Sequence, residues 1–109
     1  MGSSGDRPLV PRQKDYQFMK NYLINYDLNL PGQNYAALWE ELRRLNGFRV
    51  LASTWVIPHL QSTAIELRDH LKRYVDANDG LFVTRVPKGE WASLNAKVDS
   101  ASLQGVLNS

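Results

Sequence analysis

Apolar and polar residues alternate from position 20 to 27, and this pattern predicts a β-strand. The residues on one side are large and apolar, as expected of a core face: Tyr22, Ile24 and Tyr26. The other side carries Leu23, Asn25 and Asp27, so this strand ends in a carboxylate on the face opposite the predicted core. The role of Asp27 therefore becomes the central question about function.

Two later segments have helical spacing. In residues 35–45, apolar positions recur every three or four residues: Tyr35, Leu38, Trp39, Leu42 and Leu45. Asn34 can cap the start of this helix, and Asn46-Gly47 is typical of its end. Thr63 and Glu66 form a capping-box pattern that opens a second helix. Its predicted buried stripe is Ala64, Leu67, Leu71, Tyr74 and Val75.

The remaining regular segments predict strands. Residues 48–57 are rich in β-forming residues but long for one strand, so we expect two strands with a break near Ala52-Ser53 and a stop at Pro58. A last strand covers 81–86. The order βαββαβ predicts an α+β, ferredoxin-like fold, with an antiparallel sheet ordered 4-1-3-2 and two helices on one face.

The chain divides into three parts. Residues 1–18 have the composition of a tag or disordered leader, residues 19–89 form the ferredoxin-like domain, and residues 90–109 are an apolar C-terminal extension. We expect this extension to pack on the domain, on a dimer partner or on another protein. The central first strand would leave its Leu23 and Asn25 face uncovered within one chain, which predicts a homodimer with both residues at the interface.

Composition narrows the class of protein without identifying it. With 43% hydrophobic and 22% charged residues the chain is typical of a globular protein, and it has no apolar run long enough to cross a membrane. The absence of cysteine excludes disulfides and thiolate zinc sites and is consistent with the cytoplasm. Residues 1–18 hold three basic and two acidic residues. The rest of the chain therefore has ten basic and nine acidic residues, a net charge of +1. Net charge alone therefore does not indicate a nucleic-acid partner.

The sequence resembles the small CRISPR-associated adaptation proteins, a family of dimeric ferredoxin-like endonucleases that partner the spacer integrase. The resemblance covers roughly residues 19–86 and rests on Tyr26-Asp27 at the end of the first strand, on the segment Arg49 to Trp55, and on the order of elements. Two features depart from the family. Leu51 stands where a Gln is frequent, and uncharged residues follow Asp27 where a basic run is frequent. The related virulence-associated D-type ribonucleases show the same likeness.

The resemblance implies a metal-dependent endonuclease with a role in antiviral defence, in which Asp27 is the catalytic and metal-binding residue. One carboxylate is a poor site for Mg²⁺ or Mn²⁺, but a dimer axis beside Asp27 would double it. Asn25 could add a neutral oxygen and Ser53 could contact a phosphate. The basic residues Arg43, Arg44 and Arg49 are candidates for nucleic-acid binding.

Plainer alternatives remain open for each of these residues. Asp27 could accept a hydrogen bond from the backbone of Asn29 in a turn, and Arg43 and Arg44 could simply complement a helix dipole. The chain could accordingly be a non-catalytic dimeric scaffold or adaptor, or a toxin-like endoribonuclease.

Overall fold

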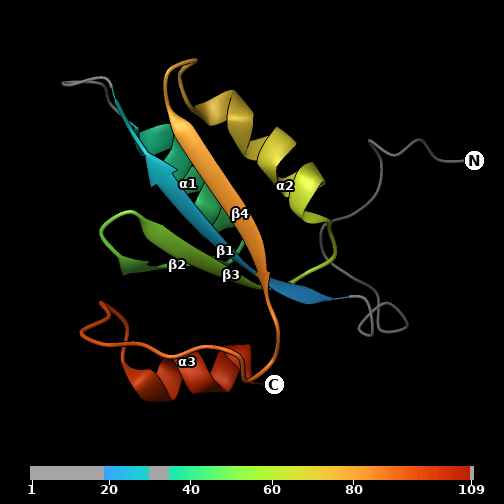
Figure 1. The fold of residues 1–109 in the computed structure, drawn as a ribbon, viewed down its shortest axis with the longest axis vertical. Coiled ribbons are helices and arrows are strands. Elements are labelled where there is room, and N and C mark those ends of the chain that lie inside the picture. Colours follow the sequence, from blue (N-terminus) through green and yellow to red (C-terminus); the bar gives the residue numbers. More distant parts are fainter. Residues whose placement is uncertain (1–18, 30–34, 109) are drawn as a thin grey trace, which may run out of the picture.

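The chain folds as an α+β protein, and the computed structural model describes residues 19–29 and 35–108 (Figure 1). Its elements are β1 (Lys20–Asp27), α1 (Ala36–Arg44), β2 (Phe48–Leu51), β3 (Thr54–Leu60), α2 (Ala64–Leu71), the short 3-10 helix η3 (Lys72–Tyr74), β4 (Gly80–Val86) and α3 (Ser100–Leu107). The predicted leader and the Asn34 cap lie outside the described residues. None of the helices in the described part has the length and apolar character of a membrane span.

The four strands form one antiparallel sheet in the order β2-β3-β1-β4, which read from the β4 edge is 4-1-3-2. The predicted first strand is confirmed as a central strand, bounded by β3 and β4. The register places four residues in one row across the sheet, because Phe82 lies opposite Asn25, and Asn25 and Leu51 both lie opposite Thr54. Side chains that are distant in the sequence therefore share one face.

Helices α1 and α2 pack on the same face of the sheet, behind it in the view of Figure 1. The apolar side of β1 and the stripes of both helices form this core: Tyr22, Ile24, Tyr26, Leu38, Leu42, Leu45, Leu67 and Leu71, together with Trp55, Ile57 and Leu60 of β3. Both predicted periodicities are confirmed. A hydroxyl inside this core needs a hydrogen bond. The Tyr26 Oη accepts one from the Trp39 Nε1 at 3.0 Å and one from the Trp55 Nε1 at 3.2 Å.

The opposite face of the sheet is partly covered by the C-terminal segment, residues 90–108, of the same chain. Leu103 and Leu107 of α3 are buried against Val50 and Val56, and Leu23 packs on this second core. The expectation that this whole face is bare within one chain is therefore wrong. A segment with six large apolar residues gains free energy by covering the nearest apolar surface, and here that surface is its own sheet.

Strand β3 continues through Pro58 to Leu60, so the predicted stop at Pro58 is wrong. The pairing register shifts here, and the two residues Pro58 and His59 stand opposite Asn21. A β-bulge tolerates proline because the extra residue makes no ladder hydrogen bond. The predicted break between β2 and β3 is confirmed, since β2 ends at Leu51 and β3 begins at Thr54.

The predicted start of α2 and the predicted end of α1 are confirmed, the latter with one refinement. Thr63 and Glu66 form the capping box at the start of α2. At the end of α1, Asn46 adopts a positive φ of 67°, and the Gly47 N–H donates to the Leu42 carbonyl at 2.8 Å. A Cβ at Gly47 would lie 2.7 Å from that oxygen, so only glycine lets the backbone approach the Leu42 carbonyl this closely. The left-handed turn itself is made by Asn46.

Candidate functional site

Asp27 is an exposed residue at the end of β1, directly opposite Gly80 of β4. Gly80 has no side chain, and a Cβ built there would be 3.6 Å from the Asp27 Cβ, with no other atom in reach. Within residues 19–29 and 35–108, this leaves room beside Asp27 on its β4 side. It lies on the sheet face that carries Asn25, as the alternation predicts.

The turn role considered for Asp27 belongs instead to Asp79. The Asn29 N–H donates to the Asp79 Oδ1 at 2.8 Å, the Tyr35 hydroxyl donates to the same oxygen at 3.0 Å, and the Asp76 N–H donates to Oδ2 at 2.7 Å. Desolvation opposes ionisation of Asp79, but these hydrogen bonds prevail and lower its pKa. Asp79 ties the end of β1 to the start of α1, and the Asn29 N–H therefore has Asp79 as its acceptor.

The row beside Asp27 is polar in the middle and apolar at both ends. The Asn25 Nδ2 donates to the Thr54 Oγ1 at 2.7 Å, which fixes the orientation of the amide. Phe82 at the β4 end is 64% exposed and Leu51 at the β2 end is 47% exposed. Large apolar side chains flanking a fixed amide are typical of a surface that another molecule covers.

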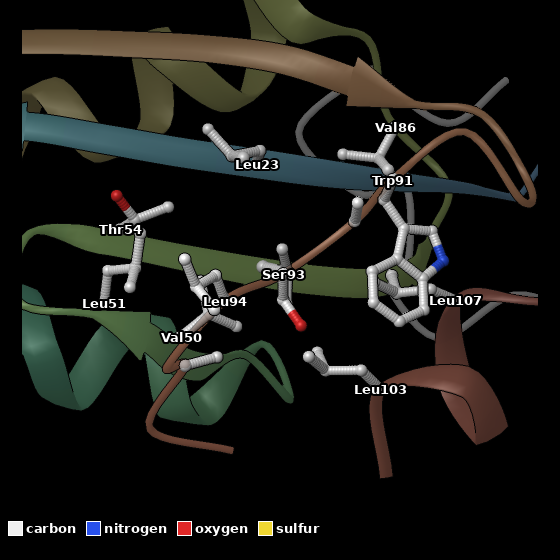
Figure 2. A pocket seen from close by; sticks show the side chains of 13 residues that line it. Leu23, Val50, Leu51, Thr54, Val86, Trp91, Ser93, Leu94, Leu103 and Leu107 are labelled. Carbon is white, nitrogen blue, oxygen red and sulfur yellow. The ribbon is translucent and has the colours of Figure 1, made fainter. Parts of the chain in front are cut away.

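An apolar pocket of about 180 Å³ lies between this face and the C-terminal segment. Figure 2 shows side chains from all four strands around it, together with Trp91, Ser93 and Leu94 of the C-terminal segment and Leu103 and Leu107 of α3. Leu94 is 83% exposed at its rim. The pocket therefore continues the exposed row toward the C-terminal segment and enlarges the apolar surface beside Asp27.

The side chains near Asp27 offer oxygen, the ligand atom that a hard divalent cation prefers, but they offer too few oxygens to hold one. Within residues 19–29 and 35–108, no group of three or more His, Asp or Glu side chains is placed to hold a metal. One chain offers the Asp27 carboxylate and, two residues earlier, the Asn25 amide oxygen, whereas Mg²⁺ and Mn²⁺ take about six oxygens. An ion at Asp27 would therefore need oxygens from a second copy, from water or from a phosphate.

The predicted basic residues do not join this site. The Arg43 guanidinium lies 5.6 Å from the centre of the Trp55 ring, and that of Arg49 lies 5.4 Å from the centre of the Trp39 ring, on the face that α1 covers. Arg49 also donates to the Ala52 carbonyl at 2.9 and 2.6 Å. These two arginines hold the fold together on the opposite face from Asp27.

Ser53, in contrast, lies beside the end of β1, because its carbonyl accepts a hydrogen bond from the Tyr26 N–H at 3.1 Å. The structure thus brings Asp27, Asn25 and Ser53 to one end of the sheet. Leu23 lies further along the same face, where the C-terminal segment half-buries it.

Two polar groupings escaped the sequence interpretation. Glu41 of α1 is buried and binds both Arg44 and His70 of α2. The pair Glu41 and Arg44 is visible as helical spacing, but the partner of His70 depends on how the helices pack. The second grouping is a basic pocket at the far end of the sheet.

Comparison with protein-family models finds no family that matches this chain, and comparison with solved structures finds none that matches it.

Proposed function

We propose that this chain is a ferredoxin-like homodimer that binds nucleic acid, in the manner of the CRISPR-associated adaptation proteins it resembles. The strand order, the two helices on one face and the central β1 support the ferredoxin-like plan. The observation that carries the proposal is the row of Phe82, Asn25, Thr54 and Leu51 beside Asp27, in which two exposed apolar side chains flank a hydrogen-bonded amide. Its occupant would be a second copy, because a two-fold axis near Asn25 pairs Phe82 with the apolar pocket and brings two Asp27 carboxylates together.

The dimer surface is tested by Phe82→Glu. The substitution would place an unpaired carboxylate in the apolar pocket of the second copy, so we expect the dimer dissociation constant to rise about 100-fold. The measurement is sedimentation velocity over a concentration series. Ile65→Glu is the matched control, because Ile65 is 65% exposed on α2, on the other face. If both variants stay dimeric, or the unmodified chain is monomeric, this face is not the interface.

Phosphodiester hydrolysis at the paired Asp27 residues is tested separately. With Mg²⁺ or Mn²⁺ and labelled DNA or RNA oligonucleotides, Asp27→Asn should lower the cleavage rate at least about 100-fold, because the amide no longer attracts the cation. Asp69→Asn on α2, which removes the same charge from an exposed residue paired with Arg68, should leave the rate within about twofold. Equal rates for the unmodified chain and Asp27→Asn would exclude hydrolysis through this carboxylate.

The engaged arginines favour a second candidate function, a non-catalytic dimeric scaffold or adaptor. Arg43, Arg44 and Arg49 contact Trp55, Glu41 and Trp39, and none of them lies beside Asp27. A dimer that survives Asp27→Asn and cleaves neither DNA nor RNA would select the scaffold. Cleavage confined to RNA, with growth arrest on expression, would instead select the toxin-like endoribonuclease.

A further inference from the structure

A second polar site lies at the end of the sheet opposite Asp27, where β1 begins and β4 ends. Strand β1 has eight residues, so the two ends are roughly 20 Å or more apart. A pocket of about 160 Å³ opens here, and Lys20, His59, Arg85 and Lys88 all line it. These four residues come from three strands and a turn, which is why the sequence did not reveal the grouping.

The bulge in β3 builds one wall of this pocket. The Asn21 Oδ1 accepts a hydrogen bond from the His59 N–H at 3.0 Å, and its Nδ2 donates to the Leu107 carbonyl at 3.2 Å. His59 has a positive φ of 56°, a conformation that histidine adopts more readily than most residues. Bulges redirect side chains at sheet ends, and the bulged residue His59 lines the pocket together with basic residues of β1 and β4. Asn21 is 7% exposed, so the wall is anchored in the buried second core.

The pocket is positively charged. Lys20 and Arg85 are diagonal neighbours on the same face of adjacent strands, and Lys88 follows β4 after one turn residue. Among residues 19–29 and 35–108, no carboxylate lines the pocket. Glu66 of α2 and Arg85 both lie near the Tyr22 hydroxyl. Burial is the largest cause that raises the pKa of the Tyr22 hydroxyl; the charge of Arg85 lowers this pKa and the charge of Glu66 raises it. Glu66 also accepts the Thr63 N–H hydrogen bond of the α2 capping box. Three of the ten lysines and arginines in residues 19–109 thus line one small pocket.

We propose that this basic pocket holds a phosphate group of a nucleic-acid strand. This inference rests on the proposed function. It places the phosphate contact far from Arg43, Arg44 and Arg49, the residues predicted to bind nucleic acid. The volume is well below the ~300 Å³ or more of pockets that enclose a whole small-molecule ligand, so it suits one phosphate whose strand continues outside. Lysine and arginine supply the charge-assisted hydrogen bonds that phosphate oxygens accept.

The test is fluorescence anisotropy with labelled 12-nucleotide single strands of DNA and RNA, in EDTA, between 50 and 200 mM NaCl. In the triple variant K20Q/R85Q/K88Q we expect affinity at 50 mM to fall about 100-fold. The slope of log affinity against log salt should shrink by about 0.7, because the contact with the one phosphate in the pocket is lost. The matched control is R68Q/K72Q/R73Q, which removes three exposed cations from α2 and η3. It should weaken binding less than about fivefold with little change in slope.

The outcomes separate this proposal from hydrolysis at Asp27. Binding is measured without metal, so a protein that binds but never cleaves still supports the pocket. A protein that cleaves through Asp27 but whose K20Q/R85Q/K88Q variant binds normally overturns the pocket alone. Equal losses in the two triple variants also overturn it, because they would reflect net charge. A titration with inorganic phosphate, followed by amide chemical shifts, completes the test. Shifts at Lys20 and His59 without any oligonucleotide binding would overturn the assignment to nucleic acid.

Discussion

A chain that ends at Gly89 is expected to lose about 4 kcal/mol of folding free energy and to associate through its exposed sheet. The missing segment contributes Leu103 and Leu107, each 2% exposed, to the second core. Full burial of a leucine side chain is worth about 1.5–3 kcal/mol, and the truncation also uncovers Val50 and Val56. For a domain whose total stability is about 5–15 kcal/mol, such a loss leaves a substantial unfolded fraction.

Urea denaturation followed by tryptophan fluorescence measures this loss, and light scattering measures association. Leu103→Ala keeps the full chain and should lower the free energy of unfolding by about 2–4 kcal/mol through the cavity it leaves. Leu94→Ala is the matched control, since the 83% exposed Leu94 should contribute less than about 0.5 kcal/mol. A truncated chain that remains stable and monodisperse would show that the segment is an independent appendage. A clean conversion from dimer to monomer would assign it to the partner, as a dimer clamp requires.

The sequence could not predict which surface the C-terminal segment packs on. Alternation in residues 20–27 and the helical stripe in residues 35–45 determine which face each element buries, because that choice depends on the period of the local pattern. In residues 90–108 the apolar positions lack a sustained period, and only part of the segment becomes helix, at α3. Whether it covers its own sheet or a neighbour depends on tertiary contacts, which no local pattern encodes.

Side-chain partners show the same division within the candidate site. Thr63 and Glu66 are three residues apart, so their capping box could be predicted and is confirmed. Asp79 hydrogen-bonds Asn29 across fifty residues, and His70 binds Glu41 across twenty-nine, so both depend on how strands and helices come together. The bulge at Pro58 is an intermediate case. Proline signals an interruption of strand pairing, but only the register reveals that the strand continues beyond it.

Glu41 is a buried carboxylate that joins α1 to α2, and its ionisation should set the acid stability of the protein. It is 7% exposed. Its Oε1 and Oε2 accept hydrogen bonds from the Arg44 guanidinium at 2.8 and 2.6 Å, and its Oε2 lies 2.5 Å from the His70 Nε2. The hydrogen bond from Arg44 is the largest cause that lowers the pKa of Glu41, to about 2, with His70 adding to the effect and desolvation opposing it.

The direction of the pH dependence follows from this lowered pKa. In the unfolded chain the pKa of a glutamate is about 4.3. Below that pH the unfolded state binds a proton at Glu41, while Glu41 in the folded state is still ionised. The contribution of Glu41 is therefore complete above about pH 5 and is lost as the pH falls toward the folded pKa of about 2. Because Arg44 is largely exposed to solvent, we expect this loss to be about 2 kcal/mol rather than the full value of the shift.

Glu41→Gln tests this linkage directly, because the amide keeps the shape of the side chain but cannot ionise. We expect it to lower the free energy of unfolding by about 2 kcal/mol at pH 6, and the gap to the unmodified chain should close as the pH falls from 5 to about 2. Urea midpoints at half-unit pH steps provide the measurement. The exposed neighbour Glu40→Gln is the matched control and should run parallel to the unmodified chain throughout. If the gap between Glu41→Gln and the unmodified chain is constant from pH 6 to 2, the ionised carboxylate is not what stabilises the α1–α2 contact.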